Sequence, residues 1–376
     1  MLMSPSMSTL KPQAHLRQQF AALRAQGLRA RDAAARLHVS EGEALIAHAA
    51  SLMPPQEAAD SRYDVTVLDA DWLGMLRALE AVGRVMALTR NDAVVHEKIG
   101  VYRKLSAQGP VGMALGPEID LRLFFAHWHT GLHVIERQAG QADLHSLQFF
   151  DAQGHAVHKV HLRPESDLAA LEALVQRHAR PEARPVFTTS DATAPRRRPD
   201  ADIDALGLAE AWGDMHDTHE FFELLKRFDV DRLQALQLMA GIHTRRAPLS
   251  AAEHLLRAAA AQSLPIMVFA GNAGCLQIHT GPVHRVELLG PWLNVLDAGF
   301  NLHLRTDAID ECWLVSKPTD DGPVTSIELF DAQGRLICMF FGERKPGKPE
   351  LPAWRHLAQD LARTGEAAAR RQAEAA

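Results

Sequence analysis

The chain has 376 residues, of which 47% are hydrophobic and 23% are charged, and its formal net charge is −6. This composition is typical of a soluble globular protein of about two domains, and the negative charge argues against a polyanion as the main partner. No apolar run approaches the ~18 residues that span a bilayer, and the N-terminal segment lacks the apolar core of a secretory signal. The three cysteines are scattered without CxxC spacing, which is typical of reduced thiols. We therefore expect a cytoplasmic protein with no membrane insertion.

The first half of the chain starts with helical patterns and continues with strands. Apolar residues recur at helical spacing in three segments, 15–26, 30–39 and 70–83. Runs rich in branched and aromatic residues then predict strands at 84–90, 120–128, 133–138, 144–150 and 156–163. This order predicts helices grouped at the front of an antiparallel sheet.

Residues 27–47 have the pattern of a helix-turn-helix, which raises the alternative of a DNA-binding regulator. A helix that reads DNA needs cations or amides directed at bases and phosphates. The second helix of this pair, SEGEALIAHAA, has two glutamates and neither lysine nor arginine. We therefore favour a helical hairpin that packs on the sheet, and we do not expect nucleic acid as a partner.

A proline-rich, charged segment at 180–204 predicts a linker. The second half then starts with WGDMHDTHEFFELLKRF, in which Asp217 and Glu220 have capping-box spacing. This spacing places Asp217 at the N-cap and His219 in the first helical turn, where the helix dipole favours a neutral imidazole. Such a histidine could ligate a haem iron, but a histidine in a first turn is more often a partly exposed residue without a ligand. The spacing alone leaves both interpretations open.

Strand patterns follow in the second half, at 265–271, 275–280, 284–290, 301–305, 311–317, 325–330 and 336–344. Three ordered blocks in this half repeat blocks of the first half. DAQG at 151–154 returns at 331–334, RNDAVVHEKIG at 90–100 aligns with 271–281, and IDLRL at 119–123 aligns with 300–304. The helical segment 19–37 shows weaker similarity to 221–239.

The ordered repeat predicts duplication of a whole domain. We expect an α+β fold, a tandem duplication of a domain with a large antiparallel β-sheet flanked by N-terminal helices. The expected limits are 13–179 for the first repeat, 180–204 for the linker and 205–363 for the second repeat.

Several cations lie beside apolar strands and could meet an anion: Arg122, Arg232, Lys317 and Arg344. A guanidinium group pairs with a carboxylate through two donors, although isolated cations at strand edges are commonly solvated. The chain is also rich in histidine, with 20 residues, yet no spacing brings together the three or four ligands that zinc needs.

Five segments of the chain together resemble a known family. These are VMALTRNDAVVHEKIGVY (85–102), IDLRLFFAHWH (119–129), DTHEFFELLKRF (217–228), GPWLNVLDAGFNLHLR (290–305) and VTSIELFDAQG (324–334). The sequence is similar to the HemS/ChuS/PhuS/HmuS-type cytoplasmic hemin-degrading and haem-trafficking proteins of Gram-negative bacteria. The similarity covers nearly the whole chain.

The resemblance implies a cofactor and a set of site residues. It implies one haem (iron protoporphyrin IX) in the second repeat, with His219 as the axial iron ligand and Arg122 opposite the iron as the distal, catalytic residue. Arg232, Lys317 and Arg344 correspond to the basic residues that hold the propionates. A haem site also needs apolar walls, which we expect from Phe221 and Phe222 and from Phe340 and Phe341.

Two departures from the family pattern affect the expected chemistry. Family members commonly read QFYGQR where this chain reads MFFGER, so Met339 and Phe341 replace a glutamine and a tyrosine on one strand face. The change predicts a drier pocket and weakens the expectation of catalytic haem cleavage more than that of haem binding. His96 matches a histidine that is linked with an additional haem site in some relatives, and its counterpart in the second repeat is Gln277.

We therefore expect a role in iron acquisition, as a carrier of haem after its uptake or as a reductant-dependent haem-degrading enzyme. The expected partners are haem and, by the same resemblance, a haem importer ATPase, a haem oxygenase or an electron donor. The alternative of a DNA-binding regulator at 27–47 belongs to a different class.

Overall fold

The computed structural model describes residues 7–138, 140–188, 197–344 and 347–374. The chain divides into two compact units, which do not coincide with its two halves. Unit 1 consists of Met1–Arg90, Glu97–Asp191 and Asn272–Leu276. Unit 2 consists of Asn91–His96, Ala192–Gly271 and Gln277–Ala376. Each unit therefore includes a short segment from the other half of the sequence.

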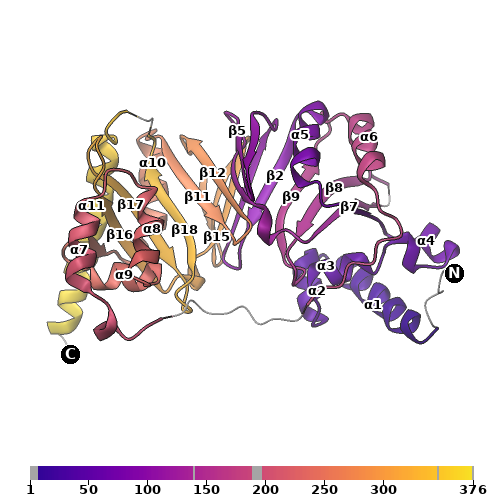
Figure 1. The fold of residues 1–376 in the computed structure, drawn as a ribbon, viewed down its shortest axis with the longest axis horizontal. Coiled ribbons are helices and arrows are strands. Elements are labelled where there is room, and N and C mark those ends of the chain that lie inside the picture. The colour runs from indigo at the N-terminus through magenta and orange to yellow at the C-terminus, as the bar shows by residue number, and fades with distance from the viewer. Residues whose placement is uncertain (1–6, 139, 189–196, 345–346, 375–376) are drawn as a thin grey trace. The chain divides into compact units, whose positions relative to one another are not determined.

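Unit 1 is an antiparallel sheet with helices on both faces (Figure 1). Its helices are α1 (Met7–Ala25), α2 (Ala30–Arg36), α3 (Glu41–Ile46), α4 (Pro55–Asp60), α5 (Trp72–Val82) and α6 (Leu168–His178). Its main strands are β1 (Tyr63–Leu68), β2 (Val85–Arg90), β7 (Thr130–Glu136), β8 (Leu144–Phe150) and β9 (Ala156–Leu162), in the order β1-β7-β8-β9-β2. A meander of β4 (Leu105–Gln108), β5 (Val111–Leu115) and β6 (Asp120–Phe124) also belongs to this unit.

Unit 2 repeats this arrangement. Its helices are α7 (Ala205–Gly213), α8 (Glu220–Arg227), α9 (Arg232–Leu238), α10 (Ala251–Ala261) and α11 (Pro352–Glu374). Its main strands are β10 (Thr244–Arg246), β11 (Ile266–Gly271), β16 (Glu311–Lys317), β17 (Val324–Phe330) and β18 (Leu336–Gly342), in the order β10-β16-β17-β18-β11. Its meander is β13 (Val286–Leu289), β14 (Trp292–Asp297) and β15 (Phe300–Arg305). The division between the units passes through the remaining strands, β3 (Val94–Gly100) and β12 (Cys275–Gly281).

The identical strand order in the two units confirms the predicted α+β fold with a duplicated antiparallel domain. The hairpin turns at DAQG are also present in both units. Asp151 and Asp331 each accept backbone hydrogen bonds across their turn, and Gly154 and Gly334 have positive φ angles of 79° and 76°. The same register shift precedes each turn, at Phe149/Phe150 in β8 and at Leu329/Phe330 in β17.

The helices of the second repeat match those of the first at a different offset from the one predicted. His38 and Asp229 both have positive φ, and each connects two short helices, α2 to α3 and α8 to α9. They are 191 residues apart, so α8 corresponds to α2, and the predicted match of 19–37 with 221–239 is wrong. Helical periodicity is tolerant of shifts by whole turns, and the left-handed residue fixes the alignment where periodicity cannot.

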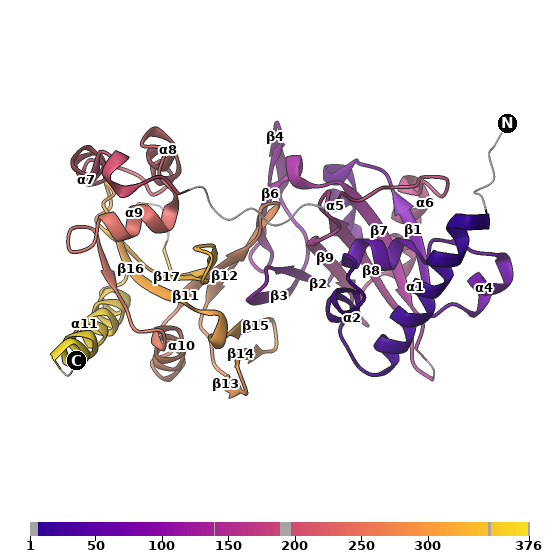
Figure 2. The ribbon, with the colours of Figure 1, turned by 90° about the horizontal axis from the view of Figure 1, so that it is seen from below.

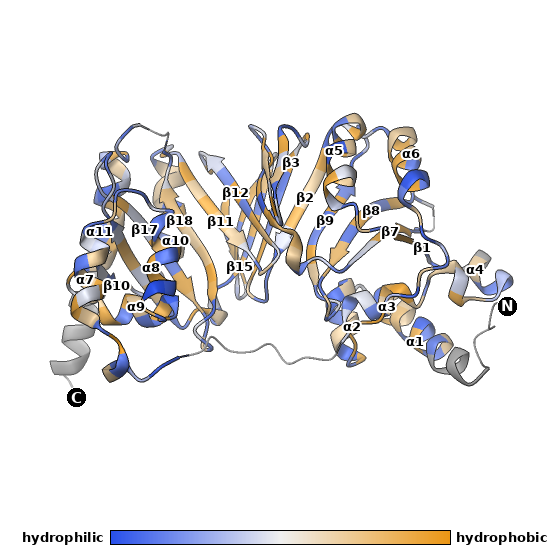
Figure 3. Cartoon of the chain, viewed as in Figure 1, coloured by the Kyte–Doolittle hydropathy of each residue, from blue (hydrophilic) through white to orange (hydrophobic). Residues whose placement is uncertain are grey.

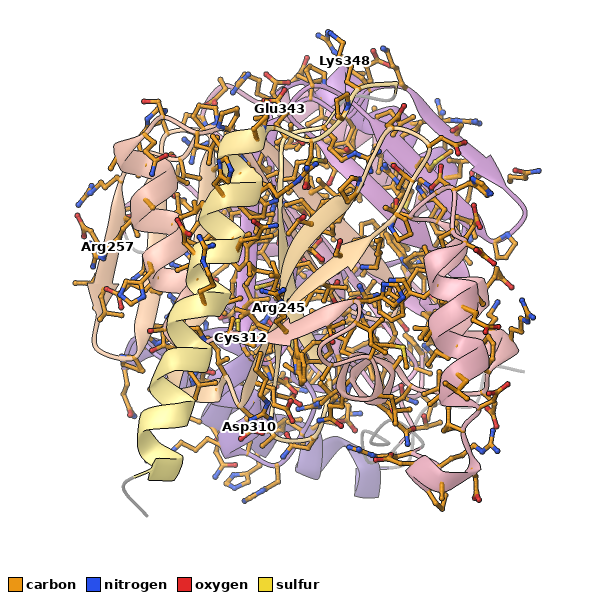
Figure 4. All side chains as sticks on the ribbon, turned by 90° about the vertical axis from the view of Figure 1, so that its left-hand side faces the viewer. Arg245, Arg257, Asp310, Cys312, Glu343 and Lys348 are labelled. Carbon is orange, nitrogen blue, oxygen red and sulfur yellow. The ribbon has the colours of Figure 1, made fainter. Side chains whose placement is uncertain are left out.

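The sheet of unit 2 has two differently covered faces. One face packs against α10 and α11, which cross it in Figures 1 and 4. Buried residues of this layer include Leu256, Cys312, Leu329, Phe340 and Trp354. The other face packs against α7, α8 and α9, and these three helices lie together on the opposite side of the sheet in Figure 2. They cover mainly β16 and β17, through Trp313, Val315 and Phe330.

Part of the predicted linker is ordered against unit 1. The Thr188 backbone N–H donates to the Ala152 carbonyl, and the Phe187 ring packs 5.9 Å from His129. Residues 189–196 lie outside the described residues. Within the described ranges, no helix is both long and apolar enough to cross a membrane.

Candidate functional site

The start of α8 differs from the predicted capping box. His219 is itself the N-cap residue, two positions after Asp217. The Asp217 carboxylate accepts the backbone N–H of His219 at 2.8 Å, and Glu220 accepts the backbone N–H of His216 at 3.3 Å. A tight turn at 216–219 replaces the expected first helical turn, because the aspartate side chain offers its own acceptor to a nearby backbone donor.

His219 is the most exposed ionisable side chain of this turn, with 92% of its surface accessible. Its Nδ1 lies 2.6 Å from the Asp217 carboxylate. A carboxylate accepts a hydrogen bond and cannot donate one when ionised, so it holds the proton on Nδ1 and leaves the lone pair on Nε2. The pKa of Asp217 is lowered, first by the His219 backbone N–H, which keeps the carboxylate ionised. The ring is thereby oriented as in a ligating histidine whose second nitrogen is held by a carboxylate.

His216 has a different partner from His219. Its Nδ1 lies 2.8 Å from the Asp320 carboxylate, in the loop that follows β16. The hydrogen bond with Asp320 raises the pKa of His216 above its usual value. The Asp320 backbone N–H also donates to the His216 carbonyl. His216 therefore links the turn at 216–219 to the loop after β16. The sequence did not indicate this role.

An apolar surface lies on the face of the sheet that α7–α9 leave partly uncovered. Met267 and Phe269 of β11 and Phe341 of β18 are half-buried on this face. The neighbouring strand β17 contributes polar residues to the same face, because Ser326 is opposite Phe341 and Glu328 is opposite Met339. The Phe269 and Phe341 rings are 4.9 Å apart, and β11 and β18 are mostly hydrophobic in Figure 3. We call Met267, Phe269, Met339 and Phe341 the apolar floor.

A buried ion cluster adjoins the apolar floor. Arg232 donates two hydrogen bonds to the Glu328 carboxylate, at 2.7 and 2.8 Å, and a third to the Met339 sulfur at 3.2 Å. Lys317 donates to the same carboxylate at 3.0 Å, as does the Ser326 hydroxyl at 2.9 Å. Glu328 is fully buried, and the charges of Arg232 and Lys317 hold its pKa well below the usual range against the opposing effect of burial. Two cations and one carboxylate leave the cluster with one net positive charge.

Sequence reasoning missed Glu328. A glutamate between the apolar residues of the predicted strand TSIELF was the available signal, because a carboxylate within a central strand is rarely buried without a paired cation. Burial lowers the pKa of Lys317 to about 8, and the neighbouring Glu328 opposes this effect. Lys317 is only 4% exposed. It therefore lies beneath the protein surface and not at the mouth of the expected haem pocket.

The four phenylalanines that were predicted as pocket walls have different positions. Phe221 is buried, with Lys317 Nζ 4.4 Å and the Arg232 guanidinium 5.1 Å from its ring centre. Phe340 is also buried, in the layer under α10 and α11, because strand alternation turns it away from Phe341. The prediction is therefore wrong for Phe340, whereas Phe221 packs against the ion cluster. Phe222 is 62% exposed, and Phe341 lies in the apolar floor.

Arg344 follows β18 and lies close enough to Asp217 for its charge to lower the pKa of that carboxyl. Its nearest carboxylate partner is Asp321, at 4.0 Å, a distance too long for a strong ion pair. The Arg344 Nε is buried and has no hydrogen-bond partner. A buried guanidinium nitrogen without an acceptor is costly, and a carboxylate ligand would satisfy it.

Arg122 belongs to unit 1, whereas His219 and the other predicted site residues belong to unit 2. Its guanidinium pairs with Asp120 on the same strand. Met113 lies directly opposite Arg122 on β5, and Val111, Met113 and Leu115 form an exposed apolar row on that strand. Three large apolar side chains in one exposed row indicate a surface that meets a ligand or another part of a protein.

The helix-turn-helix-like segment packs on the sheet of unit 1. Ala33, Ala34 and Leu45 are buried against β1 and β7, and Glu41 is buried in an ion pair with Lys159. The second helix of the pair has no lysine or arginine. This second helix therefore lacks the cations that a DNA-reading helix needs for phosphate contacts.

Comparisons with known proteins agree with this architecture. The model of the haemin-degrading HemS.ChuX domain matches the chain twice, at residues 38–178 and 229–361. The hemin transport protein HmuS of Yersinia pestis is 38% identical over 346 residues, which are 91% of this chain and 96% of that protein. The structure of holo-PhuS, a heme-binding protein from Pseudomonas aeruginosa, is 44% identical with a TM-score of 0.86, covering 93% of this chain and 99% of that one.

The heme degrading enzyme ChuS of Escherichia coli O157:H7 is also similar, at 33% identity and a TM-score of 0.83, with 93% of this chain and 99% of that chain covered. The two matches of the domain model, together with these relatives, define the class of the protein. It contains two fused copies of the HemS.ChuX domain. The chain belongs to the HemS family.

Proposed function

We propose that this protein binds one haem in unit 2, with His219 as the axial ligand of the iron. The observation that carries the proposal is the geometry of His219, an exposed imidazole whose Nδ1 is held by Asp217 at 2.6 Å. The family supports it, because the relatives include a hemin transport protein and a heme-binding protein.

The residues around His219 suit a flat apolar ligand with carboxylates at one edge. The apolar floor offers half-buried aromatic and thioether side chains, which pack well against a large ring system. Arg344 has the buried Nε without a partner, and we assign it to one carboxylate. Arg232 and Lys317 are already paired with Glu328, so we infer that they attract the ligand through the net charge of the ion cluster.

Arg122 is the proposed distal residue, as the family resemblance implies. A guanidinium group can orient a small polar molecule by hydrogen bonding, or hold a water molecule, without ligating a metal itself.

We do not propose a second haem at His96. The His96 ring is fully buried in unit 2 and lies 4.9 Å from the Phe300 ring. A haem could reach this ring only if the core opened.

Carrier and enzyme are the two roles that this site could serve. When bound, haem supplies the iron and porphyrin at which any oxidative cleavage takes place, and an external donor supplies the electrons. Met339 and Phe341 leave the apolar floor without a hydroxyl or an amide, so it holds few groups that could order water. This favours a carrier in the cytoplasm that transfers haem after uptake. A haem importer ATPase, a haem oxygenase and an electron donor are the proposed partners.

Hemin titration followed by absorption tests the proposal. We expect a sharp Soret shift that saturates at one equivalent of hemin. A gradual change without a defined endpoint would contradict it.

Incubation of the complex in air with a reductant then distinguishes the two roles. A carrier keeps its Soret band and releases no iron, whereas an enzyme loses the band with time. The same incubation without oxygen is the control, because reduction alone shifts the band without destroying it.

A further inference from the structure

Two histidines in unit 1, outside the residues of the haem proposal, lie in contact on one sheet face. His133 of β7 is opposite Leu147 of β8, and His145 of β8 is opposite Ile135 of β7. Residues that are directly opposite in an antiparallel pair share a face, so the two histidines are diagonal neighbours. Their ring centres are 5.7 Å apart, and the ring planes are inclined by 28°.

Each ring has one buried nitrogen without a hydrogen-bond partner. These atoms are Nε2 of His133 and Nδ1 of His145. Buried polar atoms of this kind usually have a partner, and an exception points to a missing ion or water. Burial lowers the pKa of His133 to about 4, and His145 adds to this effect. His133 is therefore neutral at pH 7, the form in which imidazole binds metals.

The spacing of the rings fits a shared metal ion. With metal–nitrogen bonds of about 2.0–2.1 Å, a tetrahedral metal bound to one nitrogen of each ring holds the ring centres roughly 5–5.5 Å apart. The observed 5.7 Å needs only a small adjustment of the side chains. His145 is half-buried, so the pair lies near the surface of unit 1.

We propose that His133 and His145 form a binding site for a divalent transition metal ion, with solvent as the remaining ligands. The described residues contain no group of three or more histidine, cysteine, aspartate or glutamate side chains at metal-binding spacing. Asp64 is the nearest acidic candidate on the adjoining strand, where it is opposite Ile135, but it pairs with Arg137 at 3.5 Å. Among the divalent first-row ions, Cu²⁺ generally binds nitrogen ligands most tightly, which makes it the most sensitive probe of this pair.

Copper binding to the haem-free, full-length protein tests this inference. Cu²⁺ is titrated into wild type, His145→Gln, His133→Gln and the control His155→Gln, whose side chain is 64% exposed on the turn after β8. Calorimetry gives stoichiometry and affinity, and electron paramagnetic resonance reports nitrogen ligands. We expect each variant of the pair to lose one equivalent or to bind it at least about tenfold more weakly, as expected when a metal ligand is lost. The control should bind as wild type does.

Equal stoichiometry and affinity in all four proteins would overturn the inference and leave two stacked imidazole rings without a metal. Because His145 is only half-buried, His145→Gln should fold even if His133→Gln does not. Thermal melting checks the fold of each variant. Hemin binding in unit 2 is independent of this site, so failure of either proposal leaves the other intact.

Discussion

His216 and His219 are three positions apart, and their hydrogen bonds separate their roles. His216 is fastened to Asp320 in the loop after β16, whereas His219 is held only by its near neighbour Asp217. The sequence indicated that the two histidines differ, but it placed the helix start two residues too early. Local competition between an aspartate side chain and the helix for backbone donors is not visible in a spacing pattern.

Glu328 gives a testable prediction at the residue scale. Replacement by glutamine leaves the buried Lys317 and the half-buried Arg232 without an anion. Removal of one member of a buried ion pair costs about 3–5 kcal/mol. We expect Glu328→Gln to lower the free energy of unfolding by this amount in urea melts. Glu223→Gln, at an exposed pair with Lys226, is the control and should change it by less than about 0.5 kcal/mol.

The pH dependence of the same residue provides a second check. The pKa of Glu328 is lowered in the folded state, so its contribution is complete above the unfolded pKa of about 4.5 and is lost as the pH falls below that value. The difference between wild type and Glu328→Gln should therefore narrow on acidification. A constant difference from pH 7 to pH 3 would contradict the ion-cluster account.

At the scale of elements, strand alternation was the most informative signal. The strands with long apolar runs were predicted from the sequence, and so was the shared face of Met339 and Phe341. Strands β1, β3, β4, β5, β10 and β14 were missed, because short, exposed or mixed runs carry little periodicity. The chemistry of the site was less predictable than its scaffold, since the pairing of Glu328 with Arg232 joins residues 96 positions apart.

The two DAQG turns give a matched pair of glycine substitutions. Both glycines have positive φ, so alanine costs about 1–2 kcal/mol at either position. At Gly154 a new Cβ would also lie 2.1 Å from the Ser40 hydroxyl, whereas at Gly334 the nearest atom is 3.5 Å away. We expect Gly154→Ala to lower the melting temperature more than Gly334→Ala does. Equal melting temperatures would show that Ser40, at the start of α3, moves away from the new Cβ without a loss of stability.

At the scale of the whole molecule, duplication was the strongest prediction from the sequence, and the repeated strand order confirms it. What the repeat did not indicate is that each unit includes a short segment from the other half of the chain. In unit 2, Asn91 donates to the carbonyls of Gly271 and Ile337, and in unit 1, Asn272 donates to those of Arg90 and Val157. A linear sequence pattern cannot show such an exchange, because both segments look like ordinary hairpin turns. The limits 13–179 and 205–363 remain our proposal for the repeats.

The matching hydrogen bonds of Asn91 and Asn272 predict that alanine at either position lowers the free energy of unfolding by the same amount. Each also accepts two backbone N–H groups, so alanine at either position removes four hydrogen bonds. At about 1 kcal/mol for each bond, Asn91→Ala and Asn272→Ala should each lower the free energy of unfolding by about 2–4 kcal/mol. Gln153→Ala, on an exposed turn, is the control. An effect in only one unit would contradict the reciprocal arrangement.

The most direct test of the central claim compares the two histidines of the α8 turn. Hemin is titrated into wild type, His219→Ala and His216→Ala, and the Soret band is followed to saturation. We predict that His219→Ala loses the wild-type Soret position and the tight endpoint, because the axial imidazole is gone. His216→Ala should keep the wild-type Soret position, because its imidazole faces Asp320. Wild-type affinity and spectrum in His219→Ala would contradict the assignment of the iron ligand.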